Sequence, residues 1–85
     1  MNDIDQAIAQ FVDQKQKALR AYYASFGSFT TPVLSVESGR RYARIVKTVG
    51  ASRDALYFVD MATGKVHEAK SYRSPKPWSC ANVFA

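Results

Sequence analysis

The residues of this 85-residue chain that could do covalent chemistry are a single histidine and a single cysteine. An imidazole that takes the proton of a thiol makes the sulfur a nucleophile, so His67 and Cys80 would form a nucleophile–base pair if they met in the fold. They lie in different segments, and nothing in the sequence brings them together. We therefore interpret His67 as a surface or cross-strand residue.

Metal binding and acid–base catalysis by carboxylates need several groups at characteristic spacing. The acids after residue 26 show no paired pattern, and one histidine with one cysteine supplies no ligand set. The glycines stand singly, without the glycine-rich loop that holds a phosphate. The sequence predicts no catalytic residue, no metal and no cofactor, and we expect a protein that is not an enzyme.

More residues of the chain support the binding of an anionic partner. Single-stranded nucleic acid requires cations for its phosphates and planar side chains on which its bases stack. The candidate binding residues are Arg41, Tyr42, Arg44, Lys47, Tyr57, Tyr72, Arg73, Lys76 and Trp78. The competing interpretation is that the tyrosines pack across strands and the arginines keep the sheet soluble. No glycine–aromatic signature of an RNA-recognition sheet is present.

The charge distribution also suits an anionic partner. The formal net charge is +5. Residues 1–26 hold three acidic and three basic side chains, whereas residues 27–85 hold nine basic against four acidic, so the whole surplus lies in the second segment. A basic patch fits nucleic acid or an acidic protein surface. A charge of this size is also ordinary for a small soluble domain.

One long amphipathic helix is predicted over residues 3–26. Asn2 or Asp3 is expected to cap its start and Gly27 to end it. Its apolar residues recur with helical spacing at Ile4, Ile8, Phe11, Val12, Leu19, Tyr22, Tyr23 and Phe26, with Lys15 as the polar break.

Aromatic residues crowd the end of this apolar stripe, where Phe29 follows Tyr22, Tyr23 and Phe26. We favour the interpretation that these rings pack on the sheet formed by the rest of the chain. The alternative is that they contribute to a partner surface or to a homo-oligomer.

Four strands are predicted where runs of β-branched and aromatic residues alternate with turn residues, at about 33–36, 41–49, 55–60 and 65–70. Short loops favour an antiparallel meander of three or four strands with the helix on one face. The expected fold class is therefore α+β, in a single domain of residues 1–85. The other face of the sheet is expected to be open to solvent or to a partner.

The strongest local signal is the hairpin between the last two predicted strands. Asp60 can accept backbone hydrogen bonds at the start of its turn, and Gly64 can take the left-handed conformation that closes it. In the second predicted strand, Ala43, Ile45 and Val49 are the expected core residues.

The tail, residues 71–85, contains two prolines that favour an extended path. Its apolar residues Trp78, Val83 and Phe84 predict that it folds back and caps one end of the core. No apolar run approaches the ~20 residues of a membrane span. One cysteine makes no internal disulfide, so a reducing, cytoplasmic setting is expected.

The hairpin and the tail carry a resemblance to known proteins. The pattern aromatic-x-x-Asp-x-x-Thr-Gly-x-Val at residues 57–66, then Lys-Ser-Tyr-Arg-Ser-Pro at 70–75 and Asn-Val-Phe at 82–84, resembles small proteins from tailed-bacteriophage genomes. The resemblance covers about residues 42–84. Those proteins have a tryptophan where this chain has Tyr72, and a Lys-His-Ala-Arg stretch where it has residues 77–80. They have no nameable activity, so the resemblance implies a phage origin and no mechanism. With that origin, the cytoplasm expected from the single cysteine is that of the host cell.

We therefore expect a small phage accessory protein that binds a host or phage protein through the open sheet face and residues 72–78. The first alternative is nucleic-acid binding through Arg40, Arg41, Arg44, Lys47, Arg73 and Lys76. The second is a minor structural component of the virion. Salt separates the leading expectation from the first alternative, because phosphate binding weakens steeply with ionic strength and an apolar protein interface does not.

Overall fold

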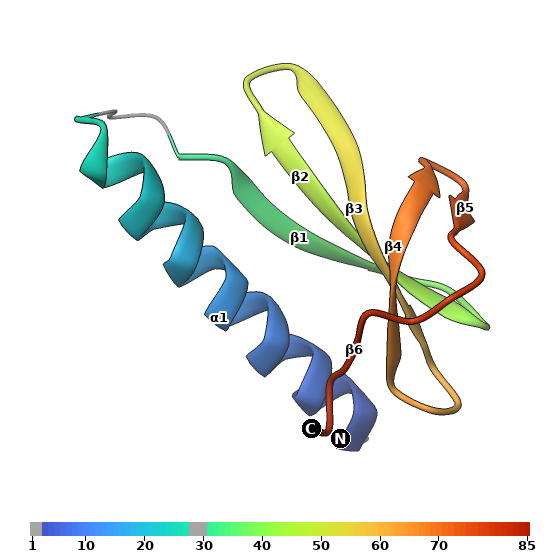
Figure 1. The fold of residues 1–85 in the computed structure, drawn as a ribbon. Coiled ribbons are helices and arrows are strands. Elements are labelled where there is room, and N and C mark those ends of the chain that lie inside the picture. Colours follow the sequence, from blue (N-terminus) through green and yellow to red (C-terminus); the bar gives the residue numbers. More distant parts are fainter. Residues whose placement is uncertain (1–2, 28–30) are drawn as a thin grey trace.

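The computed structural model describes residues 3–27 and 31–85. Within these residues one helix, α1 (Asp3–Ser25), lies against one antiparallel sheet, and the predicted α+β fold class is confirmed (Figure 1). The strands in chain order are β1 (Val33–Ser38), β2 (Tyr42–Val49), β3 (Ser52–Asp60), β4 (Lys65–Ser71), β5 (Ser74–Pro75) and β6 (Ala81–Asn82).

Helix α1 begins at Asp3, as predicted, and ends one residue before the predicted end. Asp3 and Asp5 lie in its first turn, where the helix dipole favours negative charge. Gly27 ends the helix with a φ of 72° and donates its N–H to the Ala24 carbonyl oxygen at 3.0 Å. The predicted cap Asn2 and the ring of Phe29 lie outside the described residues.

The sheet follows the order β1-β2-β3-β4-β5, so the main strands form the predicted meander. The hairpin between β3 and β4 has the predicted turn, since Gly64 has a φ of 77° and the Asp60 carboxylate accepts from the Ala62 N–H at 2.8 Å. The predicted number of three or four strands was too low, because the sheet also contains β5 and β6, two strands of two residues each.

Both additional strands come from the tail, and both pair with β4. Between them, the Lys76 N–H donates to the Glu68 carbonyl oxygen and the Cys80 N–H to the Val66 carbonyl oxygen, each at 2.8 Å. The tail thus covers the β4 edge of the sheet. Runs of two residues have no periodicity from which a strand could be predicted.

The core lies between the first half of α1 and the centre of the sheet. Its buried cluster consists of Ile4, Ile8, Ala43, Ile45, Val59 and Val66. Of the three tail residues predicted to cap the core, Val83 packs against this cluster, but the prediction was wrong for Trp78 and Phe84, which are 63% and 58% exposed. Of the expected core residues in β2, Ala43 and Ile45 are fully buried, but the prediction for Val49 was wrong. Val49 ends its strand beside a hairpin turn and is 41% exposed.

A bulge bends the sheet. The register passes from Ile45 opposite Tyr57 to Val46 opposite Ala55, so Leu56 is an extra residue in β3. A bulge of this kind increases the local twist and bends its strand. Beyond it β3 and β4 diverge, since their pairing covers only residues 57–59 of β3.

Candidate binding surfaces

The outer face of the sheet, which faces away from α1, carries a charged network centred on Glu37 of β1. Its carboxylate accepts from the guanidiniums of Arg44 and Arg53, each at 3.0 Å, and from the Tyr72 hydroxyl at 3.2 Å. The hydrogen bond from Arg44, followed by that from Arg53, holds the pKa of Glu37 below its ordinary value. The same carboxylate raises the pKa of the Arg53 guanidinium.

This network covers the sheet beneath it. Glu37 of β1 lies opposite Arg44 of β2, and Arg53 of β3 lies opposite Thr48 of β2. The ion pair between Glu37 and Arg53 therefore crosses β2 above Val46, which lies between Arg44 and Thr48 on the same face. Val46 is fully buried, and Phe58 beside it is 4% exposed under the Arg44 guanidinium. The expectation of an open outer face was therefore wrong at its centre, because bending of the sheet brings Tyr72 over β1.

Next to the network lies a cavity of about 310 Å³, which we call the arginine cavity. Arg40 from the β1–β2 turn and Arg73 from the β4–β5 turn line it, and Tyr42 and Phe58 contribute aromatic surface. Neither Arg40 nor Arg73 forms an ion pair with any residue of the described chain. The Nε of Arg44, which also lines the cavity, is buried without a hydrogen-bond partner in the described chain. The cavity therefore has an excess of positive charge.

Part of the tail adjoins this surface through His67, which lies opposite Phe58. The His67 ring is 6.2 Å from that of Tyr42, and its Nδ1 lies 2.9 Å from the Lys76 carbonyl oxygen and 3.0 Å from that of Trp78. Both neighbours are acceptors, so Nδ1 carries the proton and donates to them. His67 thereby holds the segment that presents Trp78, which is 63% exposed.

The other predicted binding residues divide between the two faces. Arg41 is exposed and lies 5.1 Å from the Tyr42 ring, on the outer side of the sheet. Lys76 pairs with Glu68 at 3.1 Å. Strand alternation places Lys47 and Tyr57 on the α1 side, so the structure does not bring them together with the arginines.

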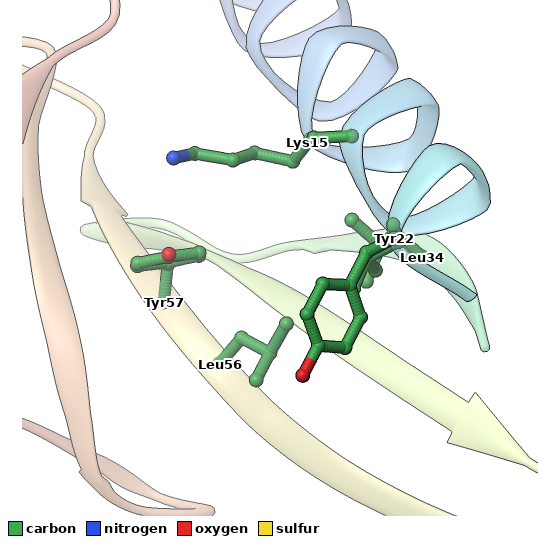
Figure 2. Close-up of a pocket in the computed structure, with 7 residues that line it drawn as sticks. Lys15, Tyr22, Leu34, Leu56 and Tyr57 are labelled. Carbon is green, nitrogen blue, oxygen red and sulfur yellow. The ribbon is translucent and has the colours of Figure 1, made fainter. Parts of the chain in front are cut away.

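A second cavity, about 300 Å³, separates the latter half of α1 from the sheet. In Figure 2, Lys15 and Tyr22 of α1 point toward Leu56 and Tyr57 of β3, and Leu34 lies behind them. The Tyr57 ring packs edge-on against Phe11 at 5.7 Å, and the Lys15 ammonium lies 5.8 Å from it. Tyr57 thus contributes to the helix–sheet contact.

The aromatic end of α1 begins at that cavity, which Tyr22 lines. The expectation that its rings pack on the sheet was wrong for Tyr22 and Phe26, which are 60% and 70% exposed. They pack on each other instead, with ring centres 5.0 Å apart. The cause is the gap under the latter half of the helix, because only Ile4, Ala7 and Ile8 of α1 are buried among its described residues.

Sequence reasoning did not identify Glu37 as the centre of the outer face or Phe58 as part of the arginine cavity. Glu37 lies in a segment of turn-like composition, and its role depends on Arg53 and Tyr72, which come from other strands. A weak signal for Phe58 was its alternation with Tyr57, which places the two rings on opposite faces.

Within residues 3–27 and 31–85, no group of three or more histidine, cysteine or acidic residues is arranged to hold a metal ion. In the same part of the chain, α1 is too polar to cross a membrane. A protein-family model described as a family of unknown function (DUF7717) matches residues 1–82. No curated protein and no solved structure shows significant similarity to the chain.

Proposed function

The chain belongs to this family of unknown function, and we propose that it is a small non-catalytic accessory protein that binds an acidic segment of a host or phage protein. The binding surface is the arginine cavity together with Trp78. The resemblance of residues 42–84 to tailed-phage proteins supports the phage setting.

The observation that carries the proposal is the meeting of Arg40 and Arg73 in one cavity with aromatic surface beside them. The two come from different turns and lack ion-pair partners in the described chain. A carboxylate placed between two guanidiniums accepts charge-assisted hydrogen bonds, which are stronger than neutral ones. An aspartate or glutamate of a partner therefore fits this position, and its neighbouring residues can contact Tyr42 and Trp78.

Several features favour a protein over a nucleic-acid strand. A strand needs a continuous positive groove and free aromatic faces. Here two acids interrupt the positive charge, since Glu37 pairs with Arg44 and Arg53 and Glu68 pairs with Lys76. One face of the Tyr72 ring is also occupied, since the Arg44 guanidinium lies 4.5 Å from its centre.

The proposal is tested by affinity capture from host lysate and from infected-cell lysate, with and without nuclease, followed by mass spectrometry. The test variant is Arg40→Gln with Arg73→Gln. The matched control is Lys17→Gln with Arg20→Gln, which removes the same charge from α1. We expect one or a few proteins to be retained after nuclease by the wild type and the control and lost from the test variant.

Binding of the captured protein should then weaken about tenfold in the purified test variant. Two results would contradict the proposal. One is capture that disappears on nuclease treatment, with affinity that falls steeply as salt rises, which would indicate nucleic acid. The other is a partner whose affinity is the same for the test and control variants, which would place its site elsewhere.

A further inference from the structure

Strand β1 forms one edge of the sheet, and half of its backbone groups point away from the sheet. The Gly39 N–H donates to the Tyr42 carbonyl oxygen, so odd-numbered residues of this strand bond to β2. In an antiparallel pair the bonded residues alternate with residues that face outward. Leu34, Val36 and Ser38 therefore present their N–H and carbonyl groups to the free edge.

Helix α1 already covers the first of these positions with one side chain. The Gln16 amide accepts from the Leu34 N–H at 2.7 Å and donates to the Pro32 carbonyl oxygen at 2.8 Å. An amide that donates and accepts along a strand edge imitates the backbone of a neighbouring strand. Beyond it, the backbone groups of Val36 and the Ser38 N–H have no hydrogen-bond partner within the described chain.

A groove follows this edge. Two cavities, of about 470 Å³ and 280 Å³, lie between α1 and β1, and Ala9 and Val36 line both of them. The groove is apolar at Ala9, Val12 and Val36. Ala9 lies at the centre of the helix side of the groove, where its small side chain leaves room for an incoming chain. Val36 is 39% exposed there.

The two edges of the sheet differ in how far other segments of the chain cover them. The tail covers the β4 edge with two short strands and further backbone bonds. Exposed edges otherwise invite pairing with another chain, and proteins commonly protect them. Residues 52–56 of β3 extend past its pairing with β4, and the bulge at Leu56, whose twist is itself one such protection, separates them from the paired part. Strand β1 is six residues long, and the register of its pairing with β2 shows no bulge.

We propose that the β1 edge binds an extended segment of a partner protein as an added antiparallel strand. Such a segment supplies backbone groups for Val36 and Ser38 and places alternate side chains in the groove. Asp5 lines the groove beside Ser38 and forms no ion pair with a described residue, so a lysine or arginine in the segment fits there. This inference does not depend on the arginine cavity.

A second copy of the chain is a poorer occupant. Pairing of β1 with its own copy across a two-fold axis near Val36 would bring Ala9 close to Ala9 of the second copy. Asp5 of each copy would then approach Asp13 of the other, since both lie four residues from Ala9. These like charges oppose the dimer, whereas a basic extended peptide is attracted to Asp5.

The test uses the ¹⁵N-labelled full chain and three synthetic pentapeptides, because the natural segment is unidentified. One alternates valine with lysine, one alternates valine with glutamate, and one is the lysine peptide with its outward-bonding amides N-methylated. Amide exchange is measured residue by residue. We expect the lysine peptide to slow exchange at Val36 and Ser38. Ser35 and Glu37, which already bond to β2, serve as internal references and should not change.

The glutamate peptide should bind about tenfold more weakly, and the N-methylated peptide should not bind. In the protein, Val36→Pro removes the outward N–H, a change that edge strands tolerate, and should abolish binding. Val36→Ala keeps the N–H and should retain it. If Val36→Pro does not fold, the N-methylated peptide makes the same distinction on the wild-type protein.

Three results would overturn the inference. One is unchanged exchange at Val36 and Ser38 with the lysine peptide at millimolar concentration. The second is equal binding of the N-methylated peptide. The third is protection of both amides without peptide that increases with protein concentration, which would make a second copy the occupant. Arg40→Gln with Arg73→Gln should leave peptide binding unchanged, so this test and that of the proposed function can fail separately.

Discussion

The Arg44 guanidinium lies 4.5 Å from the centre of the Tyr72 ring, and the Tyr72 hydroxyl donates to the same Glu37 oxygen that accepts from Arg44. Tyr72 follows β4 and Glu37 belongs to β1, two strands that are separated by β2 and β3. This contact therefore closes the bent sheet over its own outer face and buries Val46 beneath it.

Shortening Tyr72 should open this contact. Tyr72→Phe keeps the ring over Arg44 and loses only the hydrogen bond to Glu37, so we expect a loss of about 0.5 kcal/mol in the free energy of unfolding. Tyr72→Ala also removes the cation–π contact and should cost about 1–2 kcal/mol. Urea denaturation measures both. Equal losses for the two variants would show that the stacking contributes nothing.

The Glu37 carboxylate should make stability depend on pH. Its pKa is lower in the folded protein than its ordinary value of 4.5, so its ionised form stabilises the fold above that value. This contribution is lost as the pH falls through the lower, folded-state pKa. We expect wild type to melt at a higher temperature than Glu37→Gln at pH 7, with the difference vanishing in acid. Glu68→Gln, which removes another ion-paired carboxylate, is the control. A difference that persists in strong acid would contradict this assignment.

His67 should position the tail through its Nδ1 alone. In His67→Asn the side-chain amide nitrogen can replace Nδ1, whereas the longer side chain of His67→Gln places its nitrogen where Nε2 was. Trp78 is the only tryptophan, so its fluorescence anisotropy reports on this segment. We expect lower anisotropy and a loss of about 1 kcal/mol in His67→Gln, and near wild-type values in His67→Asn. Identical behaviour of the two variants would contradict a role for Nδ1.

Filling the cavity under α1 should stabilise the fold. Ala18 lines this cavity of about 300 Å³, and Ala18→Leu adds apolar volume without loss of helix propensity. We expect a gain of about 1 kcal/mol in the free energy of unfolding. Ala21 lies on the same helix but does not line the cavity, so Ala21→Leu should change stability by less than about 0.5 kcal/mol. Equal effects at both positions would mean that the added side chain does not enter the cavity.

Substitution of two glycines measures the cost of backbone strain and the cost of a steric clash separately. Gly50 and Gly64 have φ values of 57° and 77°, but a Cβ at Gly50 meets open space, whereas one at Gly64 would lie 2.6 Å from Cδ2 of Phe84. Gly50→Ala should cost about 1 kcal/mol for its conformation alone. Gly64→Ala should cost more, and in a Phe84→Ala background most of the excess should disappear, because only the approach to Asn82 Oδ1 at 3.1 Å remains. An unchanged excess there would exclude the Phe84 ring as its cause.

Sequence reasoning correctly predicted the elements whose signals are local. The helical periodicity that begins at Ile4 and the Asp60–Gly64 turn follow from neighbouring residues, and the structure contains both, with the helix one residue shorter than predicted. The pairing of the tail could not be predicted in this way, because β6 bonds to Lys65 and Val66, far away in the chain. The tail has no strand periodicity of its own.

The candidate site was less predictable than the fold because one extra residue reorganises the sheet. The bulge at Leu56 shifts the register of β3 and lets Tyr72 reach Glu37. Counting alternate residues cannot reveal such a shift. The sequence therefore indicated Arg44 and Tyr72 as separate binding residues, whereas they stack on each other. Arg40 and Arg73 become neighbours only because two distant turns meet at one cavity.

The order of the strands in the sheet has a kinetic consequence. From β1 to β5 each strand pairs with the one next to it in the chain, so the sheet can form by successive closure of short loops. Short loops lose little entropy on closing, and folds of low contact order reach the native state quickly. The pairing of β6 with β4 and the docking of α1 join more distant segments. We expect the hairpins to form first and these two events to limit the folding rate.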